Sequence, residues 1–144
     1  MKNSIEEIQS EILEEFEDFL DWEEKYSYII ELGYDLPDFD NRFKIPENIV
    51  KGCQSQVWLV AEYNPAYDTI EFLADSDAFI VKGLVCILLR IFSEQKPKDI
   101  LESELFIFEK LGLKGHLSPS RANGLSSMVK YIKNYAEKYS DSNS

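Results

Sequence analysis

Cys53 is the residue whose type and surroundings most directly suggest chemistry. It lies within residues 50–59 (VKGCQSQVWL), where a polar run with one glycine leads into an alternating apolar run. A buried structural cysteine normally has apolar neighbours, whereas Lys51, Gly52 and Gln54 are typical of a turn or a short loop. A thiol in a loop beside a strand can be presented to another molecule. The segment therefore predicts sulfur chemistry at Cys53, with a loop cysteine of no chemical role as the alternative.

The thiol needs activation, because only the thiolate is reactive and an unperturbed cysteine pKa of about 8.5 leaves little of it at neutral pH. The cations that could activate it are Lys51, His116 and Arg121. Arg121 falls in the first turn of a predicted helix, where a cation opposes the helix dipole. Its guanidinium either binds an anion or a carbonyl group elsewhere in the molecule or forms an ordinary salt bridge with an acidic residue. His116 lies in a Gly-His-Leu loop. Two interpretations stay open: a capping or hydrogen-bonding residue, or a general base.

The remaining motifs argue against several enzyme classes. Cys86 lies in the apolar run GLVCILL and is interpreted as a small buried hydrophobic residue. The chain has no CxxC, no HExxH and no glycine-rich phosphate loop. Because a structural zinc site typically needs four ligands and the chain has two cysteines and one histidine, we expect no metal site. The absent motifs also give no reason to expect a cofactor. A cysteine hydrolase using Cys53 and His116 stays open, although its nucleophile usually begins a helix and here a strand follows.

Composition narrows the class of protein further. The 144 residues make a domain of ordinary size, and the 44% that are hydrophobic suffice for a core without disulfides. The formal net charge of −12 disfavours nucleic acid and an anionic membrane surface, whereas a basic patch on a protein partner would suit it. The acidic N-terminus does not look like a signal peptide, and no segment approaches the roughly 20 apolar residues of a membrane span. We therefore expect a single domain over residues 1–144 in the cytoplasm, where cysteines stay reduced.

The periodicity of apolar residues predicts an α+β fold, with a small three-stranded antiparallel sheet and helices packed on one of its faces. The expected elements are helices over about 5–19, 21–32, 75–92, from 97, 105–111 and 119–139, strands at 49–50, 56–63 and 69–74, and a frayed tail at 140–144. Residues 34–48 form a loop that is long for a compact domain, which suggests that it covers part of the molecule.

Caps and glycines refine these elements. Ser4 and Glu7 form a capping-box pattern before the first helix. The polar residues 75–77 offer N-caps for the central helix. Gly83 and Gly124 fall inside helical patterns, where glycine costs about 1 kcal/mol against alanine, so we expect another part of the chain to approach closely at each.

Four segments, in order along the chain, resemble the SufE family of sulfur-acceptor proteins. They are residues 22–33 (WEEKYSYIIELG), 52–58 (GCQSQVW), 75–84 (DSDAFIVKGL) and 116–125 (HLSPSRANGL). The resemblance extends from about residue 15 to residue 135, with no departure at the motif positions. Cys86 belongs to none of the motifs.

The resemblance implies a function. SufE-like proteins accept sulfane sulfur from the persulfide of a PLP-dependent, SufS-like cysteine desulfurase, which they stimulate, and pass it to a SufBCD-like iron–sulfur scaffold complex. They are accessory carriers rather than enzymes, and their fold is similar to that of IscU-type scaffold proteins. The resemblance assigns the persulfide acceptor to Cys53 and places Arg121 and Asp77 around its loop. Gly52, Gln54 and His116 are further supporting candidates, chosen from their places in the sequence.

Several alternatives stay open. An IscU-like scaffold that assembles a cluster itself would need several thiolates, typically three or more, and the lone exposed cysteine argues against it. The cysteine hydrolase is the third function. The sequence also leaves open a homodimer, and whether the cysteine loop is tucked into an apolar cavity at rest and moves out on docking, as the resemblance implies. Arg121, a cavity or docking itself could each set the fraction of thiolate.

Overall fold

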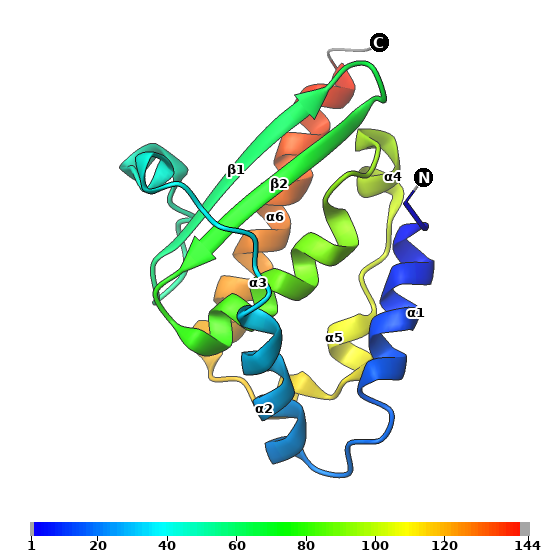
Figure 1. The fold of residues 1–144 in the computed structure, drawn as a ribbon, viewed down its shortest axis with the longest axis vertical. Helices are drawn as coiled ribbons and strands as arrows, with labels where there is room; N and C mark the ends of the chain where they lie inside the picture. The colour runs from blue at the N-terminus through cyan, green and yellow to red at the C-terminus, as the bar shows by residue number, and fades with distance from the viewer. Residues whose placement is uncertain (1, 142–144) are drawn as a thin grey trace.

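A long antiparallel hairpin lies across a layer of helices (Figure 1). The computed structural model describes residues 2–141. Its helices and strands are α1 (Ile5–Glu15), α2 (Trp22–Gly33), β1 (Val57–Asn64), β2 (Thr69–Ser76), α3 (Phe79–Phe92), α4 (Pro97–Glu102), α5 (Ile107–Lys110) and α6 (Pro119–Asp141). Short 3-10 turns lie at Asn41–Phe43, Pro46–Asn48 and Leu113–Gly115. The α+β class is as predicted.

The hairpin buries one of its two faces. Leu59 pairs with Ala74 in the register of β1 and β2, and both side chains are buried. Glu62 and Glu71, which also pair, are exposed on the opposite face. This alternation follows from the period of two in a strand. Helices α3 and α6 lie against the buried face (Figure 1), so the helices cover one face as expected.

The prediction of a third strand at residues 49–50 is wrong, because the sheet of the described chain has two strands. The segment makes one isolated bridge to Trp58, with the Val50 amide donating to the Val57 carbonyl at 2.8 Å. A 3-10 turn at Pro46–Asn48 precedes it and another turn follows directly. Too few residues remain extended between these turns for a ladder to form.

Helix α3 is the central helix, and it is buried on nearly all sides, as its apolar sequence predicts. Gly83 lets α2 approach it closely. A Cβ at this position would lie 1.9 Å from the carbonyl oxygen of Ile29 in α2. The predicted close approach at Gly83 is therefore confirmed, and it fixes how α2 and α3 pack.

The polar residues 75–77 do not cap α3, so this prediction is wrong. Strand β2 continues into them, and the N-cap of α3 is Ala78, which makes no side-chain capping bond. The side chains are engaged elsewhere. Asp75, for example, forms ion pairs with Lys44 at 3.1 Å and Lys82 at 3.7 Å.

The helices at the two ends of the chain agree with the sequence pattern in type and differ in extent. The capping box of Ser4 and Glu7 is present at α1, which ends at Glu15. Helix α6 continues to Asp141, beyond the predicted start of the tail at residue 140, and residues 142–144 of that tail lie outside the described residues. Within residues 2–141, no helix combines the length and the apolar character needed to span a bilayer.

Candidate functional site

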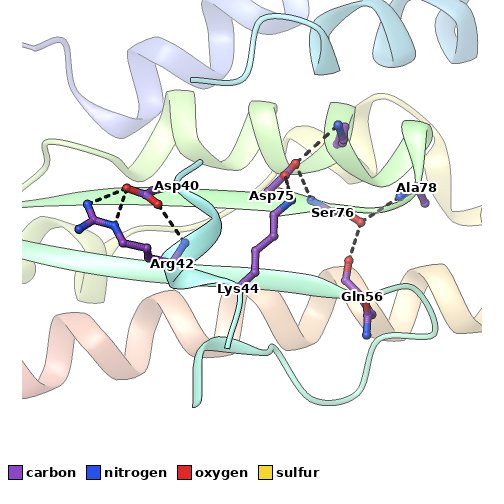
Figure 2. Close-up of polar contacts among 8 residues, drawn as sticks. Asp40, Arg42, Lys44, Gln56, Asp75, Ser76 and Ala78 are labelled. Atoms are coloured by element: carbon purple, nitrogen blue, oxygen red, sulfur yellow. Dashed lines mark hydrogen bonds and ion pairs between the residues drawn. The ribbon is translucent and has the colours of Figure 1, made fainter. Parts of the chain in front are cut away.

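Residues 51–56, called the Cys53 loop below, connect the bridged segment at residues 49–50 to strand β1. The C-terminal end of this loop is held by Ser76, the last residue of β2, and by Asp77, which follows it. The Gln56 amide donates to Asp77 Oδ1 (3.1 Å), and the Gln56 carbonyl accepts from the Ser76 hydroxyl (2.8 Å; Figure 2) and from the Asp77 amide (3.3 Å). Asp77, which the resemblance places near the cysteine, therefore anchors the loop that carries it.

The Cys53 thiol packs against the start of α6. Its Sγ lies 3.6 Å from the carbonyl oxygen of Gly124, which a weak S–H donor can reach. A Cβ at position 124 would come within 3.3 Å of that sulfur, which is tighter than ordinary contact. The predicted close approach at Gly124 is confirmed, and the absence of its side chain makes room for the half-buried thiol.

A cavity of about 290 Å³ lies beside the thiol. Its apolar wall is formed by Val57, Val81, Leu84, Leu125 and Met128, from β1, α3 and α6. Gln54 and Arg121 line the same cavity as Cys53. Two of the predicted supporting residues thus share the cavity with the cysteine: Gln54, its neighbour in the sequence, and Arg121, which comes from a distant segment.

Burial is the effect that shifts the pKa of the thiol, and one cation lies at the same cavity. Burial raises the pKa of Cys53, because a thiolate is poorly solvated in apolar surroundings. Arg121 is the charged residue that lines the cavity, and the ion pairs among the described residues do not include it. An ordinary salt bridge is therefore not the role of this guanidinium here. It remains available to an anion in the cavity, and its backbone amide is held by Ser118 Oγ at 3.3 Å.

Gly52 gives the loop its turn. Its φ of 97° lies in the left-handed region that favours glycine. A Cβ there would also lie 2.5 Å from Ser127 Oγ in α6. A side chain at this position would therefore be strained and would collide with the helix on which the loop packs.

His116 lies apart from this cavity and is not among its lining residues. Its ring stacks on that of Trp22, with centroids 4.5 Å apart and planes 11° from parallel. Because His116 is the chain's one histidine, the Cys–His pair that a cysteine hydrolase needs is not formed in the described structure. The stacking attaches the segment before α6 to α2.

Two residues that contact the Cys53 loop were not predicted. Ser127 lies under Gly52, and the Tyr131 hydroxyl accepts a hydrogen bond from the Lys51 amide at 3.1 Å. With Gly124 they occupy one face of α6, at spacings of three and four residues. This spacing is visible in the sequence, but no local signal indicates that the face meets the Cys53 loop.

The long loop before the site lies against the hairpin, as its length suggested. Lys44 extends from it to Asp75 on β2 (Figure 2), and its ammonium also lies 5.1 Å from the centre of the Trp58 ring. A second ion pair in the same view, Asp40 with Arg42, is local to the loop and exposed. The Lys44 contacts therefore fix the loop over the strands next to the Cys53 loop.

Cys86 belongs to a separate part of the molecule. It is buried, as predicted, and lines a cavity of about 500 Å³ bordered by α2, β2 and α3. Burial is the main cause that raises the pKa of its thiol. Among residues 2–141 no group of three or more His, Cys, Asp and Glu side chains is placed to hold a metal ion.

Similarity to known proteins agrees with this architecture. The solution structure of a hypothetical protein from Thermus thermophilus has the same fold, with a TM-score of 0.72 at 19% sequence identity, covering 92% of this chain and 95% of that chain. At this identity the likeness concerns the fold alone. The sequence model of the SufE family, described as an Fe-S metabolism associated domain, matches residues 10–136. Since this match spans most of the chain, the protein belongs to the SufE family and has a domain associated with iron–sulfur metabolism.

Proposed function

We propose that the protein is a sulfur carrier: it accepts sulfane sulfur on Cys53 from the persulfide of a PLP-dependent, SufS-like cysteine desulfurase and delivers it to a SufBCD-like iron–sulfur scaffold. Removing the persulfide frees the desulfurase for its next turnover, so the carrier stimulates that enzyme. The carrier itself needs no cofactor and acts in the cytoplasm. Membership of a family associated with iron–sulfur metabolism supports this role.

The transfer is thiol–persulfide exchange. The Cys53 thiolate attacks the outer sulfur of the donor persulfide, and a bond forms between Cys53 Sγ and that sulfur. The bond between the outer sulfur and the donor cysteine breaks, and the donor leaves as a thiolate. The number of electrons is unchanged, so no oxidant or reductant is consumed.

The observation that best supports the proposal is the surroundings of Cys53 Sγ. The thiol lies beside a cavity of about 290 Å³, well above the roughly 30 Å³ that a water molecule occupies in the liquid. A second sulfur atom therefore fits next to the first. The apolar side chains form one wall beside the added sulfur, and Arg121 at the cavity can balance the negative charge of a persulfide anion.

Intact-mass measurement tests this proposal. The protein is incubated with a cysteine desulfurase and cysteine under anaerobic conditions. We expect an adduct of about 32 Da, the mass of one sulfur atom, on Cys53. Cys53→Ser should lose both the adduct and the stimulation of the desulfurase, whereas Cys86→Ser, the matched control, should keep both. Uptake of labelled sulfur by Cys53→Ser would overturn the proposal.

A further inference from the structure

One face of α6 contacts the first half of the Cys53 loop, residue by residue. The three contacts run in antiparallel order: Tyr131 with Lys51, Ser127 with Gly52, and Gly124 with Cys53. Such one-to-one contact fixes the position of the thiol relative to the helix. The cavity wall behind the thiol belongs in part to the same helix.

The two ends of the loop are attached unequally. Gln56 is held by three hydrogen bonds to the end of β2 and the residue that follows it. Among the described residues, the hydrogen bonds that reach positions 51–55 both come from α6. They are the Lys51 amide to the Tyr131 hydroxyl at 3.1 Å and the weak contact of the Cys53 thiol with the Gly124 carbonyl at 3.6 Å. Of these two, the bond between Lys51 and Tyr131 has the length of an ordinary hydrogen bond.

We infer that Tyr131 is a positioning residue, whose hydroxyl holds Lys51 and thereby keeps the Cys53 thiol packed against α6, and that releasing this one bond makes the thiol more accessible to its reaction partner. The consequence for sulfur uptake rests on the proposed function of Cys53. The positioning itself rests on the contacts alone. Tyr131 does not line the cavity, and its hydroxyl bonds to the backbone amide of Lys51, so it acts through that backbone.

The strength of the bond suits such a role. A hydrogen bond between neutral groups contributes a modest net free energy, which corresponds to roughly a 2- to 10-fold change in an equilibrium constant. The Lys51 amide lies at an exposed position, so water can replace the hydroxyl when the loop moves. The bond can therefore bias the loop toward α6 without locking it there.

Removing the hydroxyl tests the inference. Tyr131→Phe is compared with Tyr135→Phe, one turn further along α6, where the ring packs on Phe72. Both changes are made in a Cys86→Ser background, so that Cys53 is the thiol that reacts. The rate of alkylation by iodoacetamide is measured from pH 6 to 10 by intact mass, and thermal unfolding is recorded for each variant.

We expect Tyr131→Phe to raise the alkylation rate at neutral pH by roughly 2- to 10-fold and to move the midpoint of its pH profile downward, because a less buried thiol ionises more easily. The charged groups around the Cys53 loop are Arg121 at the cavity, Lys51 on the loop and Asp77 at its anchor. All three are kept in every variant, so they do not cause a difference between the pH profiles. Tyr135→Phe should leave rate and profile unchanged. An unchanged rate and pH profile for folded Tyr131→Phe would overturn the inference.

Sulfur uptake is then measured separately with a desulfurase and cysteine, following the persulfide adduct over time. Tyr131→Phe should load Cys53 faster than the Tyr135→Phe control. If alkylation responds and neither variant accepts sulfur, the proposed function fails while the positioning role of Tyr131 stands. If both load sulfur equally and alkylation does not respond, the positioning role fails while the carrier function stands.

Discussion

The half-buried Cys53 thiol is subject to two opposite consequences of its burial. Burial raises the pKa of the thiol, so less of it is thiolate at neutral pH and it is a slower nucleophile. The same protonation slows oxidation to sulfenic acid, which proceeds from the thiolate. In the proposed carrier, where the thiol has to survive between encounters with its partner, slower oxidation is the useful consequence of burial. In the same proposal, Arg121 at the cavity favours the anionic form of the persulfide.

Replacing Gly124 tests the packing of this thiol. In Gly124→Ala the new Cβ would lie 3.3 Å from Cys53 Sγ, so the thiol must shift away from α6. We expect faster alkylation of Cys53, measured by intact mass in a Cys86→Ser background. Alanine also favours a helix over glycine by about 1 kcal/mol, so the crowding should leave the free energy of unfolding nearly unchanged. Alkylation at the unaltered rate would contradict this account.

Gly115→Ala is the matched control, because a Cβ there would meet nothing within 4 Å. This variant should alkylate at the same rate as the parent protein. The comparison separates a local effect on the thiol from a general loosening of the chain.

At the level of residues, the sequence indicates candidates whose immediate neighbours are unusual, and it misses contacts between residues far apart in the chain. Cys53 could be predicted from its polar neighbours, and Arg121 from its unfavourable place in a first turn. Tyr131 could not, because its partner Lys51 is 80 residues away. His116 stacks on Trp22, and no local pattern indicates that contact.

At the level of elements, helices with strong periodicity are predictable and the edge of the sheet is not. The buried faces of α1 and α6 follow from spacing alone, and so does the alternation in β1 and β2. The third strand does not form because the turns on either side of residues 49–50 leave room for one isolated bridge only. The prediction of an N-cap at residues 75–77 is wrong because Asp75 forms ion pairs with Lys44 and Lys82 instead. A local sequence pattern does not indicate these ion pairs.

The attachment of the long loop to the hairpin can be tested at Asp75. Asp75→Asn removes the charge that pairs with Lys44 and Lys82. We expect a loss of stability of about 1 kcal/mol or less, as is usual for partly exposed ion pairs, and faster tryptic cleavage after Arg42 and Lys44. Limited proteolysis followed by mass spectrometry measures this rate.

The control for that experiment is Asp40→Asn. Asp40 pairs with Arg42 within the same loop, at an exposed position. Its loss should leave cleavage after Lys44 unchanged, because it does not attach the loop to the strands. Equal cleavage in the two variants would show that Asp75 does not hold the loop.

The close packing of α2 on α3 makes Gly83 intolerant of any side chain. In Gly83→Ala the added Cβ would lie 1.9 Å from the Ile29 carbonyl oxygen, which is backbone and has little freedom to move. We expect a loss of about 3 kcal/mol, at the upper end of the usual cost of overpacking, despite the better helix propensity of alanine. Denaturant unfolding measures the loss. A stability equal to that of Gly115→Ala would show that the two helices can separate without cost.

At the level of the whole molecule, one polar cluster joins the first three helices. Glu15 of α1 accepts hydrogen bonds from Arg90 of α3, one of them at 3.0 Å, and from the Tyr28 hydroxyl of α2. The hydrogen bond from Arg90 is the largest cause that lowers the pKa of the Glu15 carboxyl. Burial and the bond to Glu15 raise the pKa of Tyr28 to about 12. The three ionisation states therefore depend on the helices staying packed together.

These shifts set the pH range over which the cluster stabilises the fold. The pKa of Glu15 is lower in the folded chain than its ordinary value of 4.5. Its contribution is therefore fully present above that value and is lost as the pH falls through the lower, folded pKa. Tyr28 acts in the other direction: its contribution is present below its ordinary pKa of 10.0 and is lost as the pH rises towards 12.

Glu15→Gln isolates the charge at this junction, because glutamine keeps the shape and can still accept hydrogen bonds. Near neutral pH we expect it to lower the free energy of unfolding by about 1 kcal/mol, since the pair with Arg90 is partly exposed to solvent. The difference from the parent protein should shrink steadily below pH 4.5, where the carboxyl of the unfolded chain is increasingly protonated. Urea unfolding at a series of pH values measures it. Glu14→Gln, at the exposed neighbouring position, should show no such dependence, and a constant difference for Glu15→Gln down to pH 3 would mean that packing rather than charge joins the three helices.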